Sequence, residues 1–287
     1  MEPFLAVDWG TTNRRIYLIE GDRVLHTERD GGGVASRPDF AAEVEAIRNL
    51  YGHHRIVLAG MVGSSIGWKE APYVPCPAGL GDLAKGALDL GDGIYILPGV
   101  SRLDDARADV MRGEEVQLIG AVEAGLAPPD ALLVQPGTHC KWAAMSDGAI
   151  ARFTTAMTGE LFALLRDRSI LATNLQDPVE PGEAFLAGVA KGLERDISAE
   201  LFGIRSSALL RHSTQSGRAS FASGLLIGAE VAGRLTEYAT DTAYILADNV
   251  LGALYAQAIE FAGCKAVTID SHAAFVNGIV RLEKLLP

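Results

Sequence analysis

The sequence is poor in cysteine, and the few cysteines are not arranged for cross-linking or metal binding. Cys76, Cys140 and Cys264 are the only three in the 287-residue chain, and they lie far apart. No two of them have the Cys-x-x-Cys spacing of zinc sites and redox motifs, and an odd number does not indicate a disulfide framework. We therefore expect a protein of a reducing, cytoplasmic compartment.

The sequence also lacks an excess of positive charge and a long apolar run. Its 25 Lys and Arg residues against 36 Asp and Glu give a formal net charge of −11, whereas nucleic-acid-binding surfaces are rich in basic residues. No apolar run reaches the roughly 20 residues that a membrane-spanning helix needs. The N-terminal region shows no basic segment followed by an apolar stretch and a cleavage site. We therefore expect neither nucleic acid nor membrane as a partner.

What the sequence does contain is a pattern of strands and turns that occurs twice. Apolar runs at 4–8 and 15–20 flank a polar turn, and residues 131–153 repeat the order of strand, polar turn and strand. Strands and helices mixed in this order predict an α/β protein with two similar lobes. The other expected strands are 23–30, 55–60, 93–99, 242–248 and 266–270, and the expected helices are 38–52, 109–125, 158–168, 182–202, 219–237, 249–262 and 273–286.

Two segments without a periodic pattern indicate the domain organisation. The consecutive prolines in 127–131 are typical of a linker, so we expect an N-terminal lobe of residues 1–128 and a C-terminal lobe of residues 129–287. Whether the last helix, 273–286, packs back on the N-terminal lobe is left open. Residues 61–82 are rich in Gly, Pro and Ser and are expected to form a long loop, which at such a length is usually functional. The charged segment RLDDARAD, residues 102–109, is expected to be mostly a solvated loop.

The polar turn of the first half has the composition of a phosphate-binding site. A sharp turn between two strands can direct several backbone N–H groups and hydroxyls to one point, which makes a nest for phosphate oxygens. Asp8, at the end of a buried strand, is well placed to hold Mg²⁺ directly or through water. The alternative is a polar hairpin turn with an aspartate cap. The turn residues are Gly10, Thr11, Thr12 and Asn13.

A second turn of the same kind occurs at the matching place in the second half. It is the segment QPGTHCKW, in which we assign phosphate contacts to Gly137, Thr138, His139 and Lys141. Two such turns, one from each lobe, can face each other across a cleft and together hold a triphosphate with its metal. This is the arrangement of the actin, Hsp70 and sugar-kinase superfamily, whose lobes are ribonuclease H-like.

The helix that contains RGEEVQL supplies the candidate for a catalytic base. At 100° per residue, Glu115 falls near the middle of an apolar stripe, and Glu114 falls on its edge. A carboxylate in such a place can have a raised pKa suited to accepting a proton. In the alternative, Glu115 only caps the helix or pairs with Arg112, and Asp109, just upstream, is the competing base.

A series of motifs covers nearly the whole chain and carries a resemblance. In order they are VDWGTTNRR, AGMVGSSIGWKEAPYVPCPAG, LPGV, DVMRGEE followed by QLIGA, PGTHCKW, TAMTGELFALL and GLLIGAE. On these motifs the sequence resembles the 2-dehydro-3-deoxygalactonokinases. The resemblance implies transfer of the γ-phosphoryl group of ATP to the 6-hydroxyl of 2-dehydro-3-deoxy-D-galactonate. A more distant similarity is to exopolyphosphatases, in which the second glutamate of such a pair is regarded as the base.

The sequence departs from the family pattern at two places. Ser65 stands where the family tends to have an arginine after GMVGS, so another cation must bind the substrate carboxylate. The Gly-Gly of the adenosine loop is replaced by Ala247 and Asp248, and Gly224 and Gly228 on the preceding helix are expected to approach the base instead. The residues assigned to the sugar acid are Arg14, Gly63, Ser64, Trp68, Lys69 and Arg102, with Arg15 as a further candidate cation.

These patterns together predict a cytoplasmic sugar-acid kinase that depends on ATP and Mg²⁺ and acts on a small molecule. Catalysis would rest on positioning and charge neutralisation. An exopolyphosphatase-like phosphoanhydride hydrolase is the alternative enzyme, although a loop at 61–82 suited to covering an organic substrate speaks against it. A non-enzymatic nucleotide-dependent switch or filament subunit is the other alternative, and a homodimer is left open.

Overall fold

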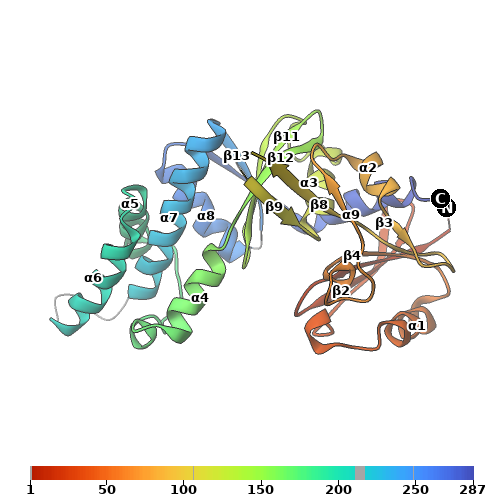
Figure 1. Ribbon diagram of the computed structural model, residues 1–287, viewed down its shortest axis with the longest axis horizontal. Helices are drawn as coiled ribbons and strands as arrows, with labels where there is room; N and C mark the ends of the chain where they lie inside the picture. The colour runs from red at the N-terminus through yellow and green to blue at the C-terminus, as the bar shows by residue number, and fades with distance from the viewer. Residues whose placement is uncertain (1, 106, 211–216, 248) are drawn as a thin grey trace. The chain divides into compact units, whose positions relative to one another are not determined.

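The computed structural model describes residues 2–105, 107–210, 217–247 and 249–287 (Figure 1). These residues form two compact units by their contacts, the first unit and the second unit. The first contains Met1–Asp130, Met145–Phe153 and Ser271–Pro287, and the second contains Ala131–Ala144 and Thr154–Asp270. The chain therefore passes between the units four times. The assignment of functional lobes with a boundary at residue 129 stays a prediction.

The first unit is built on a six-stranded sheet in the order β3-β2-β1-β4-β7-β6. β1 pairs antiparallel with β2 and parallel with β4. The parallel pair ends at the same edge of the sheet, so Asp8 and Trp9 of β1 lie beside Ala59 and Gly60 of β4. The strands are β1 (Phe4–Trp9), β2 (Arg14–Glu20), β3 (Arg23–Asp30), β4 (Arg55–Gly60), β6 (Leu88–Asp89) and β7 (Ile94–Ile96).

Helices α3 and α9 of the first unit pack against each other through glycines. A Cβ atom at Gly120 would lie 2.0 Å from the carbonyl oxygen of Ala274, and one at Gly278 would lie 2.2 Å from that of Val116. The two backbones therefore touch at glycines. The helices of this unit are α1 (Phe40–Tyr51), α2 (Leu80–Lys85), α3 (Glu114–Glu123) and α9 (Ser271–Glu283), with short 3₁₀ turns η1 (Val34–Ser36) and η2 (Met61–Gly63).

The segment between β7 and α3 differs from its prediction. Residues 99–111 form a hairpin of β8 (Gly99–Asp104) and β9 (Arg107–Met111), and β5 (Tyr73–Pro75) adds to it to make a three-stranded sheet. We predicted a solvated loop at 102–109, which is wrong. The helix predicted over 109–125 is wrong only at its start, because residues 109–111 belong to β9 and α3 begins at Glu114. Side chains of β9 alternate in burial, and Gly113 has a φ of 107°, which ends the strand before the helix. The long loop at 61–82 is likewise interrupted by η2, β5 and the start of α2.

The second unit has a five-stranded sheet in the order β12-β11-β10-β13-β14. β11 and β12 extend beyond this unit, because Met145–Phe153 belongs to the first. Its helices cover a core that includes the fully buried Trp142, Phe185 and Tyr255. The strands are β10 (Leu132–Gln135), β11 (Cys140–Ser146), β12 (Ala149–Ala156), β13 (Thr242–Leu246) and β14 (Lys265–Ile269), and the helices are α4 (Thr158–Arg168), η3 (Ala172–Asn174), α5 (Glu183–Leu193), α6 (Ile197–Leu209), α7 (Arg218–Tyr238) and α8 (Asn249–Phe261).

The helix predicted over 182–202 is two helices. α5 ends at Leu193 and α6 begins at Ile197, because Arg195 between them has a φ of 66°. A left-handed residue of this kind cannot continue an α-helix. The predictions for α4, α7 and the two strands of the β10–β11 turn are confirmed.

Both sheets follow the same order of pairing. In each, a strand pairs antiparallel with the next strand along the chain and parallel with a later one, β1 with β2 and β4 in the first and β10 with β11 and β13 in the second. The predicted α/β class and its repeated opening are confirmed. Among the described residues, the structure contains no helix with the length and apolar composition to cross a membrane.

Candidate functional site

The β1–β2 turn is fixed by its carbonyl groups and leaves its hydroxyl side chains exposed. The carbonyl oxygens of Gly10 and Thr11 accept hydrogen bonds from the N–H groups of Val34 (3.1 Å) and Ala35 (2.9 Å). A Cβ atom at Gly33 would lie 2.4 Å from the carbonyl oxygen of Thr11, so only glycine fits beneath the turn. Because the carbonyls are held by the 33–35 segment, Thr11 to Asn13 remain exposed, as a phosphate-binding turn requires.

Asp8 stands where β1 meets this turn. A Cβ atom on Gly60 of the neighbouring strand would lie 3.6 Å from Asp8 Oδ1, so the carboxylate lies directly beside the end of β4. Burial raises the pKa of Asp8 to about 6; the Arg15 charge lowers it and the Glu114 charge raises it. The carboxylate makes no hydrogen bond to any other described residue. It is therefore available to a ligand.

The first turn of α3 adds two further carboxylates. Gly113, with its positive φ, lies against Gly60, since a Cβ atom on Gly113 would be 3.1 Å from Gly60 Cα. Glu115 Oε2 accepts a hydrogen bond from the Gly113 N–H (2.7 Å), and Glu114 Oε2 accepts one from the Arg112 N–H (3.1 Å). The start of α3 thus lies beside the end of β4 and supplies charge close to Asp8.

Glu115 and Glu114 differ in their surroundings as the apolar stripe predicted. Glu115 has no exposed surface, whereas Glu114 is half-buried. Burial, followed by the Glu114 charge, raises the pKa of Glu115 to about 8, while backbone hydrogen bonds and the Arg112 charge lower it. Glu115 Oε1 is buried and accepts no hydrogen bond from the described residues. The placement of Glu115 on the buried face is confirmed; its role as base stays a prediction.

The third candidate base, Asp109, lies elsewhere. It is on β9 of the hairpin, paired in register with Arg102, and its Oδ1 accepts a hydrogen bond from the Val110 N–H (2.9 Å). Asp109 therefore lies on a strand, whereas Glu114 and Glu115 lie at the start of α3.

The second-unit turn between β10 and β11 is backed by the start of α4. A Cβ atom at Gly159 would lie 2.4 Å from the carbonyl oxygen of Gly137, and the Glu160 N–H donates to the carbonyl oxygen of Thr138 (3.0 Å). His139 Nε2 is 2.5 Å from Glu160 Oε2, so this histidine is held by a carboxylate. Thr138 and His139 are exposed. Like the first turn, this turn is held by backbone contacts on one side, and its polar side chains are exposed on the other.

Lys141 of the second turn is buried. Its Nζ lies 3.4 Å from the carbonyl oxygen of His139 and can donate to it. In the same strand, Trp142 Nε1 donates to Glu230 Oε1 (2.5 Å), and Tyr255 donates to Glu230 Oε2 (2.8 Å). This buried carboxylate ties β11 to α7 and α8, and no sequence signal other than its place in GLLIGAE indicated it.

The segment 61–72, the substrate loop, carries four of the residues assigned to the sugar acid. Ser64 Oγ donates to the carbonyl oxygen of Met61 (2.7 Å), and the Trp68 ring is stacked on Phe40 of α1 at 6.5 Å between centroids. Lys69 is exposed, and its ammonium group makes no hydrogen bond or ion pair with the residues that the structure describes. The fourth residue, Gly63, is buried. Lys69 is therefore the cation of this loop that is available to a substrate.

The arginines assigned to the substrate carboxylate have partners in the protein. Arg14 is buried, forms ion pairs with Asp30 (2.8 Å) and Glu43 (2.8 Å), and lies over the Trp9 ring. Arg102 donates to Asp104 Oδ2 (2.6 Å) and to the carbonyl oxygen of Phe153 (2.9 Å). The two guanidinium groups hold β3, α1 and the hairpin in place. Both side chains are therefore engaged by groups of the protein outside the substrate loop.

Comparison with known proteins identifies the family. A family model described as 2-keto-3-deoxy-galactonokinase matches residues 8–282. The chain is 39% identical over 282 residues to the 2-dehydro-3-deoxygalactonokinase of Escherichia coli (strain K12), and the match covers 96% of each chain. The chain belongs to the 2-keto-3-deoxy-galactonokinase family. It is accordingly a sugar-acid kinase, a phosphotransferase with an alcohol group as acceptor.

Solved structures agree with this membership. A Sinorhizobium meliloti protein assigned as a 2-dehydro-3-deoxygalactonokinase is similar with a TM-score of 0.89 and 33% identity, over 96% of both chains. Component A of (R)-2-hydroxyglutaryl-CoA dehydratase from Acidaminococcus fermentans has the same fold at a TM-score of 0.53 and 11% identity, over 99% of this chain and 98% of that one. The predicted actin-like fold is confirmed. The hydrolase and the non-enzymatic switch gain no support from these relatives.

The adenosine contacts predicted for this kinase need correction. A Cβ atom at Gly224 would lie 2.1 Å from the carbonyl oxygen of Phe185, and one at Gly228 would lie 2.5 Å from that of Val189. Both glycines of α7 are therefore covered by the backbone of α5, which leaves no room for a purine. Ala247 is half-buried after β13, and the role assigned to it stays a prediction; Asp248 lies outside the described residues.

We expect Gly224→Ala to destabilise the kinase. The added methyl group meets a backbone carbonyl of α5, and overpacking of this kind costs typically about 1–3 kcal/mol. Gly233→Ala, on the same helix with nothing within 4 Å of its Cβ position, should instead be neutral or stabilising. Urea unfolding of both variants checks the difference. A raised KM for ATP in Gly224→Ala with unchanged stability would restore the adenosine assignment.

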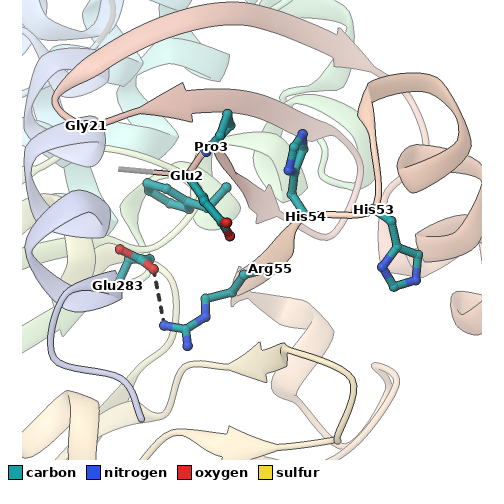
Figure 2. A pocket seen from close by; sticks show the side chains of 8 residues that line it. Glu2, Pro3, Gly21, His53, His54, Arg55 and Glu283 are labelled. Atoms are coloured by element: carbon teal, nitrogen blue, oxygen red, sulfur yellow. Dashed lines mark hydrogen bonds and ion pairs between the residues drawn. The ribbon is translucent and has the colours of Figure 1, made fainter.

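The structure also contains a cavity that holds none of the predicted site residues. It has a volume of about 390 Å³ and lies by the amino ends of β1 and β4. Figure 2 shows Arg55 in this cavity, where it contacts Glu283 of α9 at 3.2 Å. The β1–β2 turn and Asp8 lie at the opposite, carboxyl ends of the same two strands. In parallel sheets, ligands bind at the carboxyl ends, so the cavity is separate from the site.

Proposed function

We propose that this kinase transfers the γ-phosphoryl group of ATP to the 6-hydroxyl of 2-dehydro-3-deoxy-D-galactonate, with Mg²⁺ as cofactor. The observation that carries the proposal is the gathering of Asp8, Glu114 and Glu115 beside an exposed Gly-Thr-Thr-Asn turn. The E. coli relative, 39% identical over nearly the whole chain, has the activity in its name. A kinase of this family uses ATP as its phosphate donor.

The residues present fit a magnesium ion held mainly by its substrate. No group of three or more His, Cys, Asp and Glu side chains in the described residues could hold a metal ion by itself. Mg²⁺ is commonly bound through one or two carboxylates together with phosphate oxygens and water. Asp8, which makes no hydrogen bond to another residue that the structure describes, would supply such a carboxylate. When bound, the ion would neutralise charge on the phosphate oxygens.

Glu115 is the proposed base. A general base works best when its pKa is near the operating pH, and the pKa of Glu115 is raised to about 8. Its Oε1 is a buried acceptor without a donor among the described residues, and a substrate hydroxyl is a donor. Because Glu115 has no exposed surface, neighbouring side chains must move for the hydroxyl to reach it. Glu114 needs no such movement and is therefore the competing base.

Lys69 is the proposed ligand of the substrate carboxylate. We expect Lys69→Ala to raise the KM for the sugar acid about ten-fold, because a charge-assisted hydrogen bond contributes about 1.5–3 kcal/mol, and to leave the KM for ATP nearly unchanged. Lys85→Ala, an exposed lysine at the end of α2, is the matched control. Equal changes in both KM values would count against a carboxylate contact at Lys69.

A coupled assay tests the proposed function itself. The purified protein is supplied with ATP, with or without Mg²⁺, and a panel of 2-dehydro-3-deoxy sugar acids that includes the galactonate and gluconate epimers. We expect ADP release that requires both the sugar acid and Mg²⁺. ADP release without any sugar acid would favour a hydrolase. The cytoplasmic location and the homodimer stay predictions; the three cysteines, all free of disulfides, support the former.

A further inference from the structure

The substrate loop is closed by hydrogen bonds between its own backbone groups, and its Val62 and Ala71 are buried in the core of the first unit. The Trp68 N–H donates to the carbonyl oxygen of Val62 (2.8 Å), and the Ala71 N–H donates to that of Gly63 (2.9 Å). A Cβ atom at Gly67 would lie 2.2 Å from the carbonyl oxygen of Val62, so the loop is closed tightly at its centre.

In addition to this core packing, two side chains connect the loop to its neighbours in the first unit. Trp68 stacks on Phe40 of α1. From the other side, Arg112 Nη2 donates to the carbonyl oxygen of Ala71 (2.8 Å), and its guanidinium lies 4.3 Å from the centre of the Tyr73 ring, just beyond the loop. Arg112 also donates weakly to Pro72 at 3.4 Å. The loop is therefore held at both faces.

Arg112 contacts the proposed catalytic carboxylates as well. Its backbone N–H donates to Glu114 Oε2, and the next N–H, that of Gly113, donates to Glu115 Oε2. One residue thus contacts the loop through its side chain and a carboxylate through its backbone. No motif in the sequence predicted this, because the contact with Ala71 spans 41 residues of the chain.

Stability alone does not account for an arginine at this position. Arg112 is buried, and its Nε and Nη1 have no hydrogen-bond partner among the described residues. Unpartnered buried donors work against folding. The fit is also exacting, because a Cβ atom at Gly63 would lie 2.9 Å from Arg112 Nη1.

We propose that Arg112 is a positioning residue that holds the substrate loop in register with the carboxylates at the start of α3. The proposal rests on the proposed function, since it takes the loop to bind the sugar acid. Its consequence is that sugar-acid binding depends on Arg112 more than ATP binding does.

The first test is kinetic. Arg112→Met keeps an unbranched apolar stem and removes the hydrogen bonds to the loop, so the KM for 2-dehydro-3-deoxy-D-galactonate should rise about ten-fold, with the KM for ATP within about two-fold. The matched control is Arg48→Met. Arg48 is equally buried in the same unit but bonds Asp92 (2.6 Å), so its loss should lower stability and leave the ratio of the two KM values unchanged.

The second test alters the contact between Arg112 and the loop by changing a residue of the loop. Gly63→Ala should raise the same KM, and the double variant should show less than the product of the two single effects, because both act through one contact. Hydrogen exchange gives a readout independent of activity: the N–H groups of Trp68 and Ala71 should exchange faster in Arg112→Met, but not in Arg48→Met. If Arg112→Met does not fold, Arg112→Lys takes its place in both experiments.

The outcomes separate this inference from the proposed function. A wild-type protein without sugar-acid turnover overturns the proposed function. An active wild-type protein whose Arg112 variant shows equal changes in both KM values, or unchanged exchange at Trp68 and Ala71, overturns the positioning role alone.

Discussion

Glu115→Gln is expected to lower kcat by about 10²–10⁴-fold, the usual contribution of a general base, while both KM values stay within a few-fold. Glutamine has nearly the same size and can still accept the Gly113 hydrogen bond that Glu115 accepts at 2.7 Å, so the start of α3 should be preserved. Only the capacity to take a proton is lost. Steady-state kinetics with ATP and the sugar acid measure the effect.

Two matched variants identify the base if it is not Glu115. Glu114→Gln should cost much less, although Glu114 is the more accessible carboxylate, and Asp109→Asn on β9 should cost least. A large kcat loss in Glu114→Gln with little in Glu115→Gln would assign the base to Glu114 and leave Glu115 a buried support. The pH profile adds a second criterion: if Glu115 is the base, kcat should fall as the pH drops below about 8.

Glu115→Gln should also be more stable than the wild type at alkaline pH. The pKa of Glu115 rises from 4.5 to about 8 on folding, so between these values the unfolded chain binds fewer protons than the folded one. The wild type therefore loses stability as the pH rises through this window, and the loss levels off above it. Glu115→Gln has no such loss, and its advantage in urea unfolding should grow from pH 5 to pH 9. A lower stability of the variant at all pH values would indicate a purely structural role.

Asp8→Asn is expected to abolish measurable turnover without unfolding the protein. Within the described part of the chain, the carboxylate has no hydrogen-bond partner to lose. The amide has nearly the same shape, but it cannot neutralise a metal ion. Circular dichroism and the melting temperature should stay close to those of the wild type. The melting temperature should in fact rise slightly above pH 6, because burial raises the pKa of Asp8 to about 6 and its ionised form opposes folding.

A metal titration separates a metal ligand from a residue that only shapes the site. With a non-hydrolysable ATP analogue, Mg²⁺ should raise the melting temperature of the wild type and not that of Asp8→Asn, and the rise should weaken below pH 6 because metal and proton compete. Asp89→Asn, an exposed aspartate on β6 of the same sheet, is the control and should behave like the wild type. Turnover by Asp8→Asn near the wild-type rate would refute the metal assignment.

Local pattern predicted the parts of the fold in which one face of a strand or helix is buried. The two polar turns and the placement of Glu115 were predicted because alternation and helical spacing are local properties. The β8–β9 hairpin was missed because the charged side chains of RLDDARAD were interpreted as a solvated loop, although Arg102 and Asp109 face each other across its two strands.

Tertiary contacts explain the failures at the candidate site. Gly224 and Gly228 were assigned to a nucleotide because a glycine leaves space, but that space is filled by α5, whose identity no local pattern specifies. Arg14 was assigned to the sugar acid because its ion pairs to Asp30 and Glu43 form only once the sheet and α1 are assembled and no local pattern indicates them. Arg112 was noted only as a neighbour of Glu115.

The chain passes back and forth between the two units, and this sets the order in which the units can be completed during synthesis. The first unit requires Ser271–Pro287, including the glycine face of α9 that receives Gly120 of α3. A ribosome delivers these residues after every residue of the second unit, which ends at Asp270. The first unit therefore cannot be completed before the whole second unit has been synthesised.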